Sequence, residues 1–212
     1  MLKKLLLDVL FPISCVGCHR EGIFLCDRCM AGVKISDRSH DDLPQYIDDM
    51  LILFEYEKKS ALAQLIHDFK YRFSFEIKSS IDVLLSSRID CIKEFFGDAI
   101  IVPVPLFKKR LKWRGFNQAE LIAEIIARVT GRPLVHILKR TRHTAPQAEL
   151  SREARLTNVS GAFVMGKNVT LPRTVVLVDD VTSTGSTLSA CAHALKEAGV
   201  TTVRGFALAR GA

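Results

Sequence analysis

The chain has 212 residues, of which 48% are hydrophobic and 25% are charged. This length suits one domain of ordinary size with a small appendage, because domains cluster near ~100–150 residues. The composition excludes wholesale disorder as well as collagen-like and low-complexity sequence. The formal net charge of +7 permits a nucleic-acid or phosphorylated partner without requiring one.

Only the C-terminal half of the chain has a net positive charge. The segment 1–98 contains 13 basic and 16 acidic residues, which gives a net charge of −3. The segment 99–212 contains 17 basic and 7 acidic residues, which gives a net charge of +10. Clustered charge of one sign focuses the electric field on one cleft or face. We therefore expect an anion-binding site in the C-terminal half.

The apolar residues of segment 2–10 fit one face of a helix. They predict a helix that docks on the rest of the protein, and a helix lying on a membrane surface is the alternative. The segment lacks the uninterrupted apolar run and small-residue cleavage site of a secretory signal, and no stretch approaches the ~20 apolar residues of a membrane helix. We expect a cytoplasmic protein whose cysteines stay reduced.

Four of the six cysteines form two Cys-x2-Cys pairs separated by seven residues. They are Cys15, Cys18, Cys26 and Cys29. Each pair can supply two thiolates from one tight turn, which Gly17 would permit, so the quartet predicts a closed, structural zinc site. Disulfides or a redox pair, an iron–sulfur cluster and His19 as a substitute ligand are the alternatives. Cys91 and Cys191 lie in predicted helices and are expected to be buried or partly buried.

A polar, acidic segment that contains a proline, residues 36–49, follows the cysteine quartet and predicts a linker. We accordingly divide the chain into an N-terminal helix and zinc element over 1–35, the linker, and one larger domain over 50–212. Within that domain, residues 50–98 predict a strand and a helical connector, and residues 99–212 predict the ligand-binding core.

The larger domain is predicted to be α/β. Before the core, the pattern predicts a strand over 51–56 and helices over 59–72 and 76–96. In the core, strands are predicted over 99–104, 134–138, 174–178 and 203–208, and helices over 117–129 and 186–198. Continuous apolar strands alternating with amphipathic helices favour a parallel sheet covered on both faces. The polar, basic segment 140–158 is typical of a lid or binding loop.

Two carboxylates, Asp179 and Asp180, follow the apolar strand 174–178, and ligands of open α/β sheets bind at this end of a strand. A hydroxyl-rich turn then enters a helix. Its residues are Thr182, Ser183, Thr184, Gly185, Ser186 and Thr187. The backbone N–H groups, hydroxyls and helix dipole of such a turn suit a phosphate dianion. The carboxylates could grip diol hydroxyls or a magnesium ion.

Three other interpretations of this segment are weaker. A P-loop is excluded because no Gly-x4-Gly-Lys-[Ser/Thr] occurs in the chain. An acidic pair opens a receiver domain, whereas only 32 residues follow Asp180 here. A simple helix cap needs one hydroxyl, not a run of them beside two carboxylates.

A basic segment over 103–118 follows the first core strand and contains no acidic residue. Its basic residues are Lys108, Lys109, Arg110, Lys112 and Arg114, and its aromatic residues are Phe107, Trp113 and Phe116. Interleaved aromatic and basic side chains are what stacking and phosphate contacts on a single nucleic-acid strand require. Pyrophosphate binding and a merely solvated run of charges are the alternatives.

The Asp179-Asp180 segment resembles the signature of type I phosphoribosyltransferases, and the whole chain resembles the ComF family of bacterial competence-associated proteins. The further motifs that carry this resemblance are the cysteine quartet, Phe54-x-Tyr56, Pro103-x-Pro105, Arg114-Gly115-Phe116-Asn117-Gln118 and Gln147…Arg155…Asn158. Members of this family join an N-terminal zinc element to a type I phosphoribosyltransferase-like domain. The resemblance implies this fold over essentially the whole chain.

The resemblance also implies site residues. Asp179 and Asp180 would face the ribose of phosphoribosyl pyrophosphate (PRPP), which binds with Mg²⁺, and Thr182 to Thr187 would surround its 5′-phosphate. The loop after Pro105 would lie near the pyrophosphate, and 140–158 would form a mobile hood. Contacts to the anionic groups would come from Lys108, Arg114, Arg140, Gln147 and Arg155.

Two functional hypotheses follow from the resemblance, and a regulatory PRPP sensor is a third. In the first, the protein is an enzyme that transfers a phosphoribosyl group to an acceptor that the sequence leaves undefined. In the second, it retains the fold but binds single-stranded DNA through the segment Lys108 to Arg114. Both are compatible with the family's implied role in DNA uptake and natural transformation, with the DNA-uptake helicase machinery as a partner.

Overall fold

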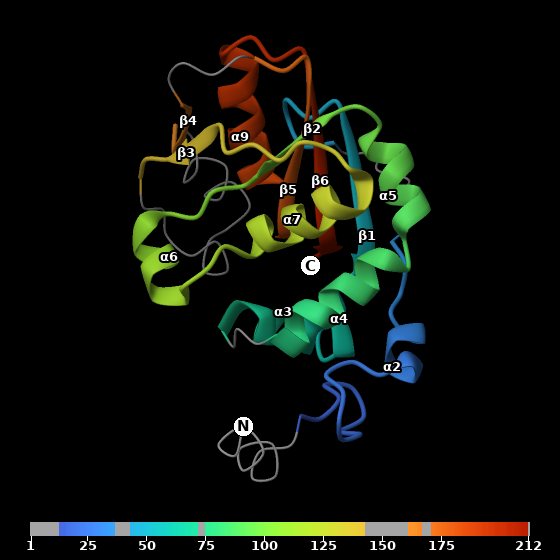
Figure 1. The fold of residues 1–212 in the computed structure, drawn as a ribbon. Helices are drawn as coiled ribbons and strands as arrows, with labels where there is room; N and C mark the ends of the chain where they lie inside the picture. The colour runs from blue at the N-terminus through green and yellow to red at the C-terminus, as the bar shows by residue number, and fades with distance from the viewer. Residues whose placement is uncertain (1–12, 37–42, 72–74, 143–160, 167–170, 212) are drawn as a thin grey trace.

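A four-stranded parallel sheet forms the centre of the protein (Figure 1). The computed structural model describes residues 13–36, 43–71, 75–142, 161–166 and 171–211. In spatial order the strands are β1 (Asp49–Glu55), β6 (Thr202–Arg210), β5 (Thr174–Thr182) and β2 (Ile100–Pro103). A small antiparallel pair, β3 (Leu138–Arg140) and β4 (Phe163–Met165), lies beside it.

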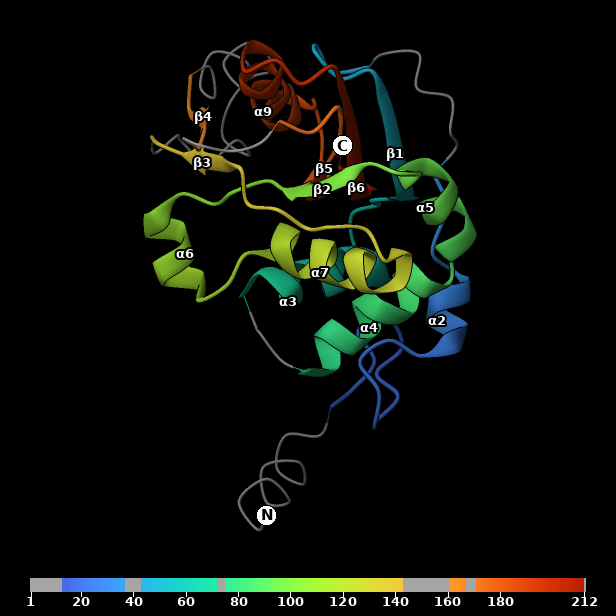
Figure 2. The same ribbon diagram turned by 45° about the horizontal axis from the view of Figure 1, so that its top comes forward.

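Helices cover both faces of the sheet, as Figures 1 and 2 show. One face carries α3 (Ala61–Tyr71), α4 (Phe75–Ser86), α5 (Ile89–Phe96) and α7 (Gln118–Thr130), and the other carries α9 (Ser186–Glu197). Successive strand residues point to opposite faces. In β5, Val176 and Val178 therefore join the first core, and Val175 and Leu177 join the second. The predicted parallel sheet with helices on both faces is confirmed.

The structure differs from the predicted elements where the chain turns. The helix predicted over 76–96 is two helices, because the Ser87 hydroxyl donates to the Leu84 carbonyl at 2.7 Å and the chain leaves helical geometry at Arg88. In place of a strand over 134–138, Leu134 forms a single bridge with Ile101. Strand β3 begins only at Leu138 and pairs with β4, which is too short for its pattern to be detected in the sequence.

The basic segment after Pro105, expected as a loop, contains a short helix, α6 (Lys108–Arg114). Gly115 ends this helix in the left-handed conformation, with φ of 81°, and its N–H donates to the Leu111 carbonyl. The basic segment therefore forms a short helix that follows the carboxyl end of β2.

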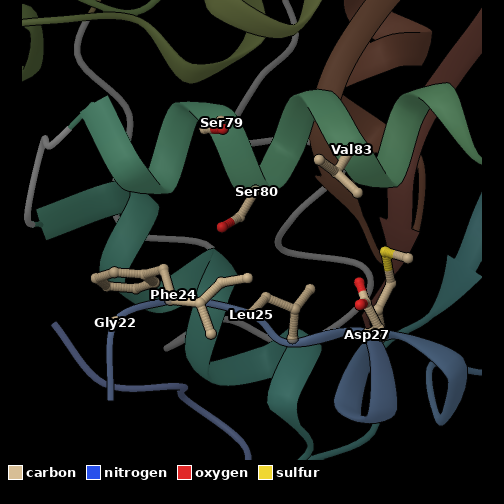
Figure 3. Close-up of a pocket in the computed structure, with 9 residues that line it drawn as sticks. Gly22, Phe24, Leu25, Asp27, Ser79, Ser80 and Val83 are labelled. Carbon is tan, nitrogen blue, oxygen red and sulfur yellow. The ribbon is translucent and has the colours of Figure 1, made fainter. Parts of the chain in front are cut away.

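The cysteine element packs against the sheet domain. After α2 (Asp27–Ala31), Ile35 bridges Phe54, and the Ser36 N–H donates to the Leu53 carbonyl at 3.0 Å, so the chain runs antiparallel along the outer edge of β1. Leu25 is buried in the core beneath α3 and α4. A pocket of about 230 Å³ remains between this element and α4, and Figure 3 shows the residues that line it. Within the described residues, no helix combines the length and apolar character needed to cross a bilayer.

Candidate functional site

The acidic pair lies where β5 extends beyond its neighbour β2. Pairing with β2 ends at Val178, whose carbonyl accepts from the Val104 N–H at 2.9 Å, whereas pairing with β6 continues to Thr182. Asp179 and Asp180 therefore lie within the last part of a strand that has lost one neighbour. The carboxyl end of such a strand is the usual ligand-binding position in an α/β sheet.

Lys70, in the last turn of α3, pairs with Asp180. Its Nζ lies 2.9 Å from Oδ2 of Asp180, and the two side chains are 25% and 14% exposed. The other oxygen, Oδ1, accepts from the Val181 N–H at 2.8 Å, and Oδ1 of Asp179 accepts from the Asp180 N–H at 2.9 Å. One oxygen of each carboxylate is thus held by the backbone, and the orientation of both groups is set before any ligand arrives.

The two carboxyl groups have opposite pKa shifts. Burial raises the pKa of Asp179 to about 8, and the adjacent Asp180 carboxylate adds to the shift. Burial would also raise the pKa of Asp180, but the Lys70 ammonium outweighs it and holds that pKa below its usual range. Burial disfavours the Lys70 ammonium as well, yet the two carboxyl groups, Asp180 foremost, raise its pKa. At neutral pH the pair therefore holds one proton and one negative charge, which Lys70 balances.

Three arginines, Arg110, Arg114 and Arg140, interact electrostatically with one another, and two of them also with residues of the acidic site. Burial, and then Arg114, lowers the pKa of Arg110, while burial, and then Arg110, lowers the pKa of Arg140. The Asp179 carboxyl group acts to raise the pKa of Arg140, and Arg114 acts to lower the pKa of Lys70. Guanidinium groups close enough to lower one another's pKa make a region of positive potential, which suits an anion. Lys108, by contrast, is exposed on α6.

The motif Arg114 to Gln118 builds one wall of the crevice. Asn117 begins α7, with its side-chain oxygen accepting from the Ala119 N–H at 3.2 Å and its amide donating to the Val104 carbonyl at 3.0 Å. The buried Gln118 donates to the Phe69 carbonyl at 3.3 Å and accepts from Arg114 at 3.0 Å. These contacts fasten α3, and with it Lys70, to the end of β2 and to α6.

The hydroxyl-rich turn connects β5 to α9. Thr182, Gly185 and Ser186 are buried, and the other three residues of the turn are half-buried. Gly185 has φ of 72°, and a Cβ there would collide with the ring of Pro44. The turn therefore requires glycine at this position for two reasons, its backbone conformation and the close approach of Pro44.

Of the remaining predicted contact residues, Arg140 lies within the described residues, whereas Gln147 and Arg155 do not. Arg140 ends β3, and its guanidinium carbon lies 5.2 Å from the centre of the Phe163 ring. Gln147 and Arg155, like most of the predicted hood 140–158 and the predicted docking helix 2–10, lie outside the described residues.

The four cysteines of the quartet converge at one point. Their sulfur atoms all lie within 4.8 Å of one another, and those of Cys18 and Cys26 are 3.6 Å apart. Four thiolates at about 2.3 Å from a central zinc ion would have similar separations, so this group could hold a metal. A Cβ on Gly17 would lie 2.7 Å from the Cys29 sulfur, which confirms that the turn needs a glycine. Cys191 is buried and Cys91 is half-buried, as expected.

Lys70, like Arg110, is not among the site residues predicted from the sequence. It lies in a predicted amphipathic helix, where a lysine in the last turn is ordinarily a favourable cap for the helix dipole. The only hint of its role in the sequence is that Lys70 directly follows Phe69, the last buried residue of this helix. Its partner is defined by the packing of α3 against the sheet, which no local pattern encodes.

Comparison with known proteins identifies a family for the C-terminal part of the chain. Residues 117–212 match the family "Phosphoribosyl transferase domain". Among solved structures, the chain is similar to a purine phosphoribosyltransferase from Pyrococcus horikoshii, with 15% identity and a TM-score of 0.38 over 66% of this chain and 85% of that one.

Relatives extend the match toward the N-terminus. The chain is 36% identical to competence protein F of Haemophilus influenzae over 169 residues, 77% of this chain and 73% of that protein. It is 35% identical to the DNA utilization protein YhgH of Escherichia coli K12, over 70% of this chain and 67% of that one. It is 30% identical to competence protein ComFC of Bacillus subtilis, over 77% and 68%. With its phosphoribosyltransferase-like α/β domain, its N-terminal cysteine cluster and these relatives, the chain belongs to the ComF family of competence proteins.

Proposed function

We propose that this protein binds a ribose phosphate of the PRPP type at the acidic pair and serves DNA uptake during natural transformation. The arrangement of Lys70, Asp180 and Asp179 at the open end of β5 carries the proposal. Carboxylate oxygens held in place can accept from the two hydroxyls of a ribose. The turn Thr182 to Thr187, at the N-terminus of α9, supplies N–H groups and hydroxyls for the 5′-phosphate. The relatives named for competence and DNA utilization support the cellular role.

The proposed reaction is phosphoribosyl transfer. As pyrophosphate departs, positive charge develops on the ribose and negative charge on the leaving group. Arg110, Arg114 and Arg140 are fixed cations that can stabilise that leaving group, and preorganised charge is a large term in catalysis. The acceptor is undefined, and a base, a nucleoside or DNA itself would each fit the chemistry.

Magnesium has no built site on the acidic pair. Backbone N–H groups orient one oxygen of each carboxylate and the Lys70 ammonium already lies on Oδ2 of Asp180, so the pair suits hydroxyl donors better than a second, resident cation. In this proposal Mg²⁺ arrives with the pyrophosphate of PRPP, because Mg²⁺ is often bound largely through substrate phosphates.

We further propose that the cysteine quartet holds one structural zinc ion. Four sulfur ligands fill a tetrahedral zinc site, so such a site is closed and stabilises the fold without taking part in catalysis. Reduced, metal-binding cysteines are typical of the cytoplasm, where we place the protein.

Calorimetric titration with PRPP and with ribose 5-phosphate tests the main proposal. We expect binding to the wild type and none to the variant with both Asp179→Asn and Asp180→Asn. Asp82→Asn, which removes an acidic residue from a surface ion pair with Arg128, is the matched control and should bind normally. Equal affinity of the wild type and the double variant would disprove the proposal. Release of pyrophosphate from PRPP on addition of bases, nucleosides or single-stranded DNA would identify the acceptor.

A second function, binding of single-stranded DNA at α6, is favoured by the charge of that helix. All five basic residues of the chain between Phe107 and Gly115 lie on α6, and Lys108, Lys109 and Lys112 are exposed. Each phosphate that a protein neutralises on a single strand lowers the slope of log K against log salt by ~0.7. Replacing these three lysines by glutamine should flatten that slope, and an unchanged slope would show that α6 does not contact DNA.

A further inference from the structure

Two large aromatic rings are exposed side by side at the mouth of the acidic site. Trp113 lies on α6 and is 70% exposed, and Tyr71 ends α3 and is 53% exposed. Their ring centroids are 5.8 Å apart and the rings are inclined at 72°. Aromatic side chains normally bury most of their surface, because they stabilise a fold or an interface most when they are removed from water. Neither ring does so here.

The surroundings of this aromatic pair are cationic and polar. The Arg114 guanidinium carbon lies 5.7 Å from the centroid of the Tyr71 ring. The ring centroid of His67, one turn earlier on α3, lies 4.8 Å from the same centroid. Phe116, the nearest other aromatic residue of the basic segment, instead packs on Phe69 in the core, with ring centroids 6.0 Å apart. Trp113 therefore lies outside the core, whereas Phe116 packs against it.

The charge around the pair is available to a ligand. Across the parts of the chain that the structure describes, no acidic side chain forms an ion pair with any basic residue of α6. Flat exposed rings next to unneutralised basic side chains suit a ligand with π faces and negative charges in alternation. An unpaired nucleic-acid strand has this character, whereas a duplex keeps its bases stacked inside.

We infer that Tyr71 and Trp113 form a stacking site for the bases of single-stranded DNA, with Lys109 and Lys112 on its phosphates. The inference rests on the second proposed function, DNA binding at α6, and adds the residues that hold the bases. Because Tyr71 directly follows Lys70, which pairs with Asp180, a base stacked there would lie next to the proposed ribose-phosphate site. The bound strand and the acidic crevice would then share one entrance.

The fluorescence of Trp113, the only tryptophan of the chain, tests this inference directly. A deoxythymidine 12-mer should quench it, whereas an abasic 12-mer with the same number of phosphates should bind through charge and leave the emission nearly unchanged. A base stacked on an aromatic ring contributes ~1–3 kcal/mol, so Trp113→Leu and Tyr71→Leu should each weaken binding of the 12-mer roughly 5- to 150-fold. Neither change should alter affinity for the abasic strand. Trp113→Phe should restore most of the affinity.

Tyr46 provides a matched control. It is also an exposed tyrosine in contact with a histidine, with 4.6 Å between its ring centroid and that of His193, but it lies beside α9. Tyr46→Leu should leave DNA affinity unchanged. If the leucine variants at 71 and 113 bind the 12-mer as tightly as the wild type, the stacking site is wrong while DNA binding at α6 stands. If the wild type binds neither strand, the second proposed function itself fails. Circular dichroism confirms that each variant is folded.

Discussion

Lys70 and Asp180 connect two distant parts of the chain across the crevice. The ammonium of Lys70 comes from the end of α3, the helix that follows the edge strand β1 in the chain, and lies 2.9 Å from Oδ2 of Asp180 on the central strand β5. The contact neutralises the single negative charge that the acidic pair carries and fixes the carboxylate that we expect to face a ribose. Binding at the acidic pair should therefore depend on a helix that the phosphoribosyltransferase family match, which begins at residue 117, does not include.

Replacing Lys70 by methionine should weaken ribose phosphate binding. A half-buried carboxylate that loses its cation is left uncompensated, at a cost of about 1–3 kcal/mol, which corresponds to roughly a 5- to 150-fold loss of affinity if binding requires the ionised form. Lys70→Arg keeps the charge and should retain most of the affinity. Calorimetric titration with ribose 5-phosphate provides the comparison. Wild-type affinity in the methionine variant would show that the ion pair has no part in binding.

Asp179→Asn should stabilise the protein at high pH. The folded pKa of Asp179 is about 8, above its unfolded value of ~3.9. Between these values the folded state holds a proton that the unfolded state has released, so stability falls as the pH rises from about 4 through about 8. Asparagine cannot titrate, so its advantage should grow over this range by up to ~1.4 kcal/mol per pH unit.

Urea unfolding of the wild type and Asp179→Asn at about pH 5 and about pH 8 measures this effect. A constant difference in the free energy of unfolding between the wild type and Asp179→Asn at the two pH values would contradict the raised pKa of Asp179.

Removal of metal should loosen more than the cysteine element. Leu25 belongs to the same core as α3 and α4, and the chain beyond α2 pairs with the edge of β1. A zinc chelator should therefore lower the midpoint of thermal unfolding of the whole protein. Metal analysis of fresh protein should give one equivalent of zinc, and a value well below one would refute the structural site.

Gly17→Ala should reproduce part of this effect. The new Cβ would lie 2.7 Å from the Cys29 sulfur and 2.9 Å from the Cβ of Ala61, so the turn must move and the sulfur geometry must change. Gly32→Ala is the control, since its Cβ would meet no atom closer than 3.5 Å. We expect zinc to be lost to a chelator faster in the first variant than in the second. Equal rates of zinc loss would mean that the turn adapts without disturbing the metal site.

Gly185→Ala, in the hydroxyl-rich turn, should destabilise the protein more than Gly131→Ala, although both glycines have a left-handed backbone conformation. Gly185 and Gly131 have φ of 72° and 69°, so alanine at either position costs about 1–2 kcal/mol in backbone strain. Only at Gly185 does the new Cβ meet another residue, Pro44. Denaturant unfolding of the two variants separates the collision from the strain, and Gly185→Ala with Pro44→Ala should recover the difference. Equal losses in both single variants would show that Pro44 yields freely.

The sequence predicted the elements whose signal is local. The run from Val175 to Val178 is apolar throughout because both faces of a central parallel strand are covered, and the structure buries all four residues. The cysteine spacing predicted the quartet for a similar reason, since each pair closes within one turn. The break at Ser87 and the pairing of β3 with β4 were missed, because a single side-chain bond and a three-residue strand leave almost no pattern.

The sequence by itself determined the α/β class, the cysteine quartet, the acidic pair and the basic excess of the C-terminal half. Each of these depends on composition or on spacing within one element. Only the tertiary structure decided that Lys70 balances Asp180, that Trp113 meets Tyr71 in solvent while Phe116 enters the core, and that Pro44 covers Gly185. These contacts join residues of different elements, so they exist only once helices and linker have packed on the sheet and long-range burial has set their distances and charges.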